Sequence, residues 1–136
     1  MVQDFDETKD NFGSVVDNPR LINLNYVNSD DGDITHANGL AYDPDKDLIY
    51  LSVNFFSEVW VIDHSTSTAE ASSHEGGTYG YGGDLVYRFG NPRAYNNLMG
   101  KVLFDHNHHP NLLAEKGYKE MLIFSNGFTS EKSTVY

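Results

Sequence analysis

Strand-forming segments and an internal repeat predict an all-β fold, specifically a fragment of a β-propeller with one complete four-stranded antiparallel blade and part of the next. Four short β-rich segments follow one another between turns, at 39–42, 47–53, 58–63 and 84–89. Residues 36–54 and 106–126 form the repeat, because each begins with His, crosses a polar turn and ends in an apolar segment that closes on Ser and Asn. Repeated units of four short antiparallel strands are typical of β-propellers. A small sandwich or meander with two chance similarities is the alternative.

The repeat divides the 136 residues into three parts. We expect 1–34 to be an acidic lead-in from a preceding blade, 35–92 to be the complete blade and 93–136 to be a partial next blade. The two histidines that open the repeat are 70 positions apart, which exceeds the usual blade of about 40 to 50 residues. The excess is mostly a stretch rich in Ser, Thr and Gly at 64–83, which predicts a long loop that is functional or mobile.

One complete blade and part of another cannot close a ring, because each blade buries its faces against its neighbours. We therefore expect this chain to be a fragment of a longer protein, with the remaining propeller blades as its partners. On its own it would expose sheet edges and be inactive. A weak helical period occurs at 111–120, and the third strand of the second unit would start at 133–136.

Composition excludes several classes of protein. The formal net charge of −11 argues against binding nucleic acid or an anionic membrane surface, both of which need clustered Lys and Arg. No apolar run approaches the roughly 20 residues of a membrane span, and the acidic N-terminus lacks the pattern of a signal peptide. The absence of Cys excludes disulfides, thiolate catalysis and zinc sites that use Cys.

An acidic turn at 28–33 raises the question of calcium, because clustered carboxylates suit a hard cation. Its spacing does not match a helix–loop–helix calcium site. A solvated acidic turn is the favoured interpretation.

Two of the six histidines open the repeated units, and we expect both to lie in a central channel. His36 and His106 each start the predicted innermost strand of a blade. Imidazole there can act as a nucleophile, as a general acid or base, or as a metal ligand. His106 and His108 would share one face of an extended strand, with His109 beside them, which makes a metal site an alternative. A polar channel lining of hydrogen-bonded histidines is the structural alternative.

Amide and cationic donors near these histidines would suit an oxyanion. Asn38 lies two residues from His36 and would share its face of an extended strand. Arg88 stands between two aromatic residues, and Arg93 follows a few residues later. Arg88 is a candidate sulfate ligand, with a stacked, structural arginine as the favoured alternative.

Several motifs, in order, resemble the bacterial arylsulfotransferase family (aryl-sulfate sulfotransferases). The motifs are His36-Ala37-Asn38-Gly39-Leu40 with Tyr42-Asp43-Pro44, then 57–64, 82–92 and 121–127. The likeness covers most of the chain from about residue 33 onwards and extends more loosely to 3–6.

The resemblance implies a six-bladed propeller whose central channel transfers a sulfuryl group from an aryl sulfate donor to a phenolic acceptor. It implies ping-pong transfer through a sulfated histidine, with no nucleotide sulfate donor (PAPS-independent), no cofactor and no metal. It also implies a periplasmic or secreted location. These properties are those of the family and are expectations for this chain.

By position, the resemblance makes His106 the nucleophile, while His36 and Asn38 match the element that binds the sulfuryl group. Arg88 is the remaining candidate for that binding. His108 and His109 are alternatives for the nucleophile, since Pro110 makes this stretch irregular. The family carries an Arg where this chain has Asn54. Asn54 and Pro110 favour a second hypothesis, a binding propeller that has kept the scaffold and lost the chemistry.

Overall fold

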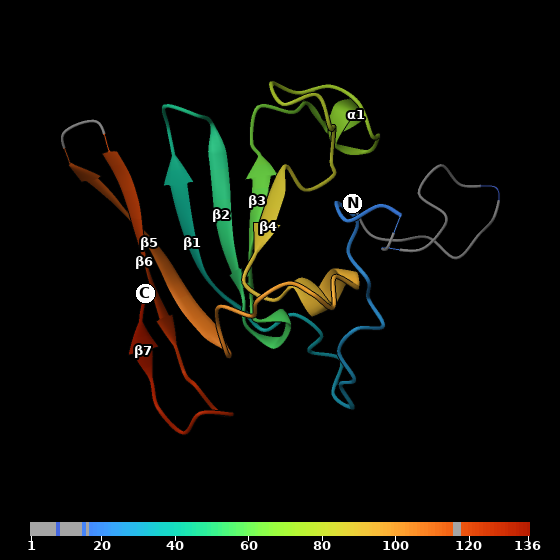
Figure 1. Cartoon of the computed structure of the whole chain (residues 1–136). Helices are drawn as coiled ribbons and strands as arrows, with labels where there is room; N and C mark the ends of the chain where they lie inside the picture. The colour runs from blue at the N-terminus through green and yellow to red at the C-terminus, as the bar shows by residue number, and fades with distance from the viewer. Residues whose placement is uncertain (1–7, 9–14, 16, 116–117) are drawn as a thin grey trace.

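The computed structural model describes residues 8, 15, 17–115 and 118–136 and is mostly β (Figure 1). A four-stranded antiparallel sheet has the order β1-β2-β3-β4, and a three-stranded antiparallel sheet has the order β5-β6-β7. The strands are β1 (Ala37–Asp43), β2 (Leu48–Val53), β3 (Glu58–Asp63), β4 (Tyr87–Phe89), β5 (Asn107–Glu115), β6 (Tyr118–Ser125) and β7 (Thr134–Val135). The described residues leave out most of the first half of the lead-in and residues 116–117. The looser part of the family resemblance, at 3–6, therefore lies outside them.

Helical structure is confined, among the described residues, to three short segments, η1 (Asn54–Phe56), α1 (Thr68–Ala71) and η2 (Pro92–Tyr95). In the same part of the chain, no helix has the length and apolar character that crossing a membrane requires. The weak helical period at 111–120 was misleading, because 111–115 belong to β5 and 118–120 belong to β6, and these strands pair with each other.

The predicted four-stranded antiparallel sheet is confirmed, with β1 longer at both ends, β2 starting one residue later and β4 starting three residues later than expected. The fourth strand begins at Tyr87 rather than at Asp84, because Asp84 and Leu85 bond to other parts of the chain. The backbone N–H of Leu85 donates to the carbonyl of Arg20 at 3.2 Å, and that of Asp84 donates to Tyr81 at 3.0 Å. The lead-in thus lies against the outer part of this sheet.

The internal repeat is confirmed in the strand pairing. Ala37 at the start of β1 pairs with Val53, and Asn54 follows directly. Asn107 at the start of β5 pairs with Ser125 in the same way, and Asn126 follows. Both first strands also contain a register shift near their beginning. The repeated sequence therefore forms two equivalent hairpins.

The loop at 64–83 is more structured than its composition suggested. It contains α1, whose N-cap Ser67 and Glu70 form a reciprocal capping box. Glu70 also accepts from the backbone N–H of Gly77 at 3.1 Å, and these hydrogen bonds lower the pKa of Glu70 to about 2. Asp63 at the end of β3 accepts from the backbone N–H of Tyr79 at 3.0 Å and fixes the loop's second half.

Two apolar clusters lie on the two sides of β3. One packs Trp60 and Phe56 against Leu85 and the lead-in. The other packs Val59 against Ile123 of β6 and against Phe104, which precedes β5. The second cluster joins the two sheets.

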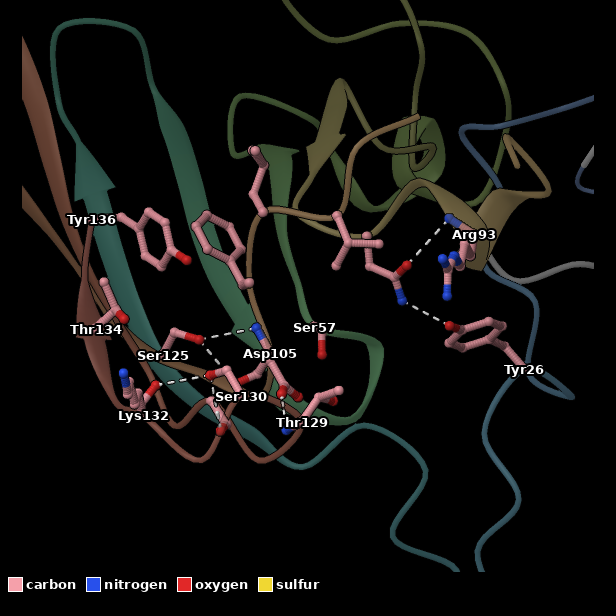
Figure 2. A pocket seen from close by; sticks show the side chains of 15 residues that line it. Tyr26, Ser57, Arg93, Asp105, Ser125, Thr129, Ser130, Lys132, Thr134 and Tyr136 are labelled. Atoms are coloured by element: carbon pink, nitrogen blue, oxygen red, sulfur yellow. Dashed lines mark hydrogen bonds between the residues drawn. The ribbon is translucent and has the colours of Figure 1, made fainter. Parts of the chain in front are cut away.

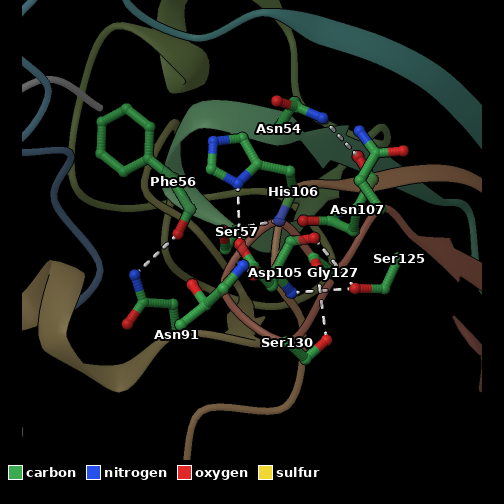
Figure 3. A network of polar contacts seen from close by, with 12 residues as sticks. Asn54, Phe56, Ser57, Asn91, Asp105, His106, Asn107, Ser125, Gly127 and Ser130 are labelled. Carbon is green, nitrogen blue, oxygen red and sulfur yellow. Dashed lines mark hydrogen bonds and ion pairs between the residues drawn. The ribbon is translucent and has the colours of Figure 1, made fainter. Parts of the chain in front are cut away.

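Asn107 joins the same two sheets by hydrogen bonds and is fully buried (Figure 3). Its side-chain amide donates to Ser52 Oγ and to the Glu58 carbonyl, each at 2.8 Å. Its own carbonyl accepts from Asn38, Ser52 and Asn54, each at 3.2 Å. The side-chain oxygen of Asn107 has no partner among the described residues, but its amide nitrogen and backbone carbonyl are paired across the two sheets, which defines the register between β5 and the first sheet.

Gly39 is needed where β1 passes closest to β5. A Cβ added at Gly39 would lie 2.7 Å from the Cα of His109, which is backbone and cannot move aside as a side chain can. We expect Gly39→Ala to lower the free energy of unfolding by about 1–3 kcal/mol, measured by urea denaturation. Ala37→Ser, at an exposed position on the same strand, is the control and should change it little. Equal stability of the two variants would show that this approach is not tight.

Candidate functional site

The candidate site lies where β1 and β5 begin, next to the junction of the two sheets. His36 and His106 occupy equivalent places directly before these strands, and both have left-handed backbone, with φ of 44° and 56°. The expectation that each lies on an extended strand was therefore wrong. Neither shares a strand face with the residue two positions later, since that alternation requires extended backbone.

His106 is held by a carboxylate at its ring and by the Ser57 hydroxyl at its backbone (Figure 3). Its Nδ1 lies 2.8 Å from Asp105 Oδ1, and its backbone N–H donates to Ser57 Oγ at 3.0 Å. Its Nε2 has no hydrogen-bond partner among the described residues. Burial opposes ionisation of Asp105, but hydrogen bonds from Thr129 and His106 outweigh it and hold the Asp105 pKa below its ordinary value.

Aromatic rings surround the two histidines that open the repeat. Phe55 stacks on His36 with ring centres 4.8 Å apart, and presents an edge-to-face contact to His106 at 6.4 Å. Phe128 makes a second edge-to-face contact with His106 at 4.7 Å. His36 Nδ1 lies 2.5 Å from Asp33 Oδ2, and hydrogen bonds from His36 hold the Asp33 pKa below its ordinary value. The acidic turn thus supplies a partner for His36.

A cavity of about 440 Å³ opens beside His106. Phe55 and His106 line one part of it, and Val27 with residues 28–31 of the acidic turn lines the rest. Among the described residues that line this cavity are the carboxylates of Asp30 and Asp31, but no Lys or Arg. The cavity could hold an aromatic group next to the imidazole.

His108 is enclosed by three asparagine amides. The Asn38 amide nitrogen lies 2.9 Å from Nδ1, and those of Asn54 and Asn126 lie 3.1 and 2.9 Å from Nε2. Burial lowers the pKa of His108, and the nearby His36 and His106 lower it further. Amide nitrogens donate and cannot accept from a ring N–H, so these surroundings disfavour the doubly protonated ring. Because both nitrogens are engaged, His108 is less suited than His106 to act as a nucleophile.

The lowered pKa of His108 predicts a loss of stability in mildly acidic solution. In the unfolded chain this ring takes up a proton near its ordinary pKa of 6.5, whereas in the folded protein it stays neutral to lower pH. The unfolded state then binds more protons than the folded state. The contribution of His108 to the free energy of unfolding is therefore fully present above about pH 6.5 and is lost as the pH drops below it. The lowered carboxyl pKa values act only at more acidic pH.

We expect the melting temperature to fall between about pH 6.5 and pH 5, and His108→Asn to flatten this slope. The slope, rather than the absolute stability, is the quantity to compare. An unchanged slope in the variant would assign the effect to other groups.

Asn38 and Arg88 are not free to bind an anion in this structure. The Asn38 amide donates to the Asn107 carbonyl and lies against His108, rather than bonding to His36. Arg88 is buried, with its guanidinium bonded to Glu58 and to the carbonyl of Leu21. The geometry therefore favours the structural role for Arg88. His36 differs, because its Nε2 has no hydrogen-bond partner among the described residues.

A second cavity, of about 550 Å³, lies between the three-stranded sheet and the segment that carries η2 (Figure 2). Arg93 and Tyr26 line one side, and Lys132, Thr134 and Tyr136 line the opposite side. Its two cations are both exposed and lie far apart across the opening in Figure 2. Asp105 also reaches its wall, so the second cavity borders the carboxylate that holds His106.

The structure shows no cluster of metal ligands, among the described residues, at the acidic turn or at His106 and His108. Within 17–115, 118–136 and the two isolated described residues, no group of three or more His, Asp or Glu side chains is placed to hold a metal ion. In the acidic turn, Asp31 accepts from Ser29, and the Asp33 carboxylate is engaged with His36.

Four site residues were not singled out from the sequence: Asp105, Phe55, Phe128 and Asn126 as a partner of His108. Asn126 was visible as the closing residue of the repeat. Asp105 gave no signal, because neighbouring residues on a strand point to opposite faces and only the left-handed backbone at His106 brings the two side chains together.

Comparison with known proteins found no matching family model, no matching curated protein and no matching solved structure. The arylsulfotransferase resemblance therefore rests on the sequence motifs, and the function has to be argued from the geometry.

Proposed function

We propose that this protein belongs to an arylsulfotransferase-like enzyme that moves a sulfuryl group from an aryl sulfate to a phenolic acceptor through a sulfated histidine. The observation that carries the proposal is the setting of His106, whose Nδ1 is bonded to Asp105 and whose Nε2 is unpartnered among the described residues beside a cavity. A nucleophile whose second nitrogen is fixed by a carboxylate is a recurring arrangement in group transfer.

In the first half-reaction, Nε2 of His106 attacks the sulfur of the aryl sulfate. An N–S bond forms, the bond between the sulfur and the ester oxygen breaks, and the phenolate leaves and takes up a proton from water. The imidazole becomes cationic, and Asp105 stabilises that charge at Nδ1. Phe55, which lines the cavity together with His106, provides apolar contact for the aryl ring.

In the second half-reaction, the oxygen of the phenolic acceptor attacks the sulfur and the N–S bond breaks. The acceptor must lose its proton, and His36 is the group we assign as base, since its Nδ1 is fixed by Asp33 and its Nε2 has no partner among the described residues. His106 is thereby returned to its neutral state.

We propose that the two sheets are successive blades of a propeller. The equivalent hairpins and the contact of β5 with β1 and β2 support this arrangement, in which both His-bearing strand starts face one channel. Exposed apolar side chains on both sheets, including Leu40 and Phe124, are surfaces that further blades would cover. A periplasmic or secreted location remains part of this proposal through the resemblance alone.

A binding protein without turnover is the second candidate. Asn54 supports it, because this residue lies against His108 and adds no positive charge where the family has an arginine. The carboxylates of Asp30 and Asp31 beside His106 would also weaken the binding of an anionic donor.

The test is an initial-rate study of the protein at its full natural length, with 4-nitrophenyl sulfate as donor and phenol as acceptor. Sulfuryl transfer with parallel lines in double-reciprocal plots would support the proposal, since these indicate ping-pong kinetics. Saturable binding of the donor with no release of 4-nitrophenol would instead support the binding protein.

A further inference from the structure

Asp105 is fixed more firmly than the histidine that it contacts. Its Oδ2 accepts from the backbone N–H of Thr129 at 2.5 Å, and its own N–H donates to Ser125 Oγ at 3.0 Å. Its carbonyl accepts from Ser125 Oγ and from the backbone N–H of Gly127, each at 3.0 Å. The carboxylate therefore has a fixed orientation, with Oδ1 directed at His106 (Figure 3).

The His106 ring has little freedom to turn away from this carboxylate. Its backbone is anchored on Ser57, and its ring makes edge-to-face contacts with Phe55 and Phe128. A neutral imidazole carries one N–H, and the nitrogen that makes the stronger hydrogen bond keeps it. An ionised carboxylate can only accept, so the proton belongs on Nδ1.

We propose that Asp105 is a positioning residue that fixes the Nδ1–H tautomer of His106 and so directs the lone pair of Nε2 into the cavity. This inference rests on the proposed function, because it assigns a task to the proposed nucleophile. The carboxylate itself touches no substrate. It acts on the reaction only through the ring that it orients.

Substitution by asparagine should reverse the tautomer, for a reason specific to this site. The backbone N–H of Thr129 requires an acceptor, so in Asp105→Asn the single oxygen of the new amide would face Thr129. The NH₂ group of that amide would then face His106 Nδ1, which must accept. The proton would move to Nε2, and the nucleophilic lone pair would be lost from the cavity.

The experiment measures the tautomer directly, by long-range ¹H–¹⁵N correlation spectra of ¹⁵N-labelled protein at its full natural length and at a pH where the ring is neutral. Loss of one ring signal in His106→Gln assigns the resonance. Wild-type protein should show His106 as Nδ1–H, and Asp105→Asn should show it as Nε2–H. Asp33→Asn, which changes the carboxylate beside His36, should leave the His106 tautomer unchanged.

A wild-type His106 that is mainly Nε2–H would overturn the inference, and this result does not depend on whether any variant folds. A folded Asp105→Asn variant that keeps Nδ1–H would overturn it as well. In an active enzyme the same variant should lower kcat by roughly 10³-fold to 10⁴-fold with little change in KM. If the tautomers behave as stated but no aryl sulfate is turned over, the proposed function fails and the positioning role of Asp105 stands.

Discussion

Substitution of His106 by alanine should lower sulfuryl transfer by at least roughly 10³-fold in the full-length protein, because no other imidazole among the described residues can replace its nucleophilic nitrogen. His108 has both ring nitrogens occupied by amides, and His36 is not among the described residues that line the cavity beside His106. The measurement is the rate of 4-nitrophenol release from 4-nitrophenyl sulfate at saturating phenol.

His64→Ala is the matched control for this loss. His64 is also paired with an aspartate, at 2.7 Å from Asp47, but it follows the far end of β3, away from the start of β1. Its removal should leave transfer within about two-fold of wild type, as expected for a surface position. Full activity in His106→Ala would assign the nucleophile to another residue.

Removal of Arg88 should cause the largest loss of stability, about 3–5 kcal/mol, because it leaves the buried carboxylate of Glu58 without its counter-ion. Glu58 is fully buried and accepts from Arg88 Nε at 3.0 Å and from Trp60 Nε1 at 2.7 Å. The guanidinium also donates to the carbonyl of Leu21, so it ties the lead-in to the sheet. Urea denaturation of Arg88→Met measures the loss.

A second substitution separates loss of charge pairing from loss of packing. The double variant Glu58→Gln/Arg88→Met removes both charges and should recover a substantial part of the stability lost in Arg88→Met. A loss below about 1 kcal/mol in Arg88→Met would contradict the structural role, since that is the range of an exposed ion pair.

The strands could be predicted from the sequence because local signals agreed with the tertiary structure. The β-branched and aromatic run at 58–63 and the turn at Asp43-Pro44 define their elements without help from distant residues. The short helix α1 could also have been predicted, from the Ser67–Glu70 capping pattern. The later start of β4 could not, because it depends on a hydrogen bond to Arg20 in the lead-in.

The candidate site was predictable only in part. The repeat identified His36 and His106 as equivalent residues, and the structure places both beside Phe55. The enclosure of His108 depends on the register between two sheets, which the sequence of either hairpin does not specify. In the sequence, Arg88 is a cation between two aromatic residues, and this pattern fits a sulfate ligand and a structural arginine equally well. Only its contact with the buried Glu58 shows which role the geometry favours.

The most direct test of the central claim is to look for the covalent intermediate. The full-length protein would be mixed with 4-nitrophenyl sulfate without acceptor, quenched at alkaline pH and digested, and its peptides analysed by mass spectrometry. We predict one added SO₃ group on His106, which disappears when phenol is supplied before quenching. Release of 4-nitrophenol with no adduct, or with the adduct on another residue, would contradict the nucleophilic role of His106.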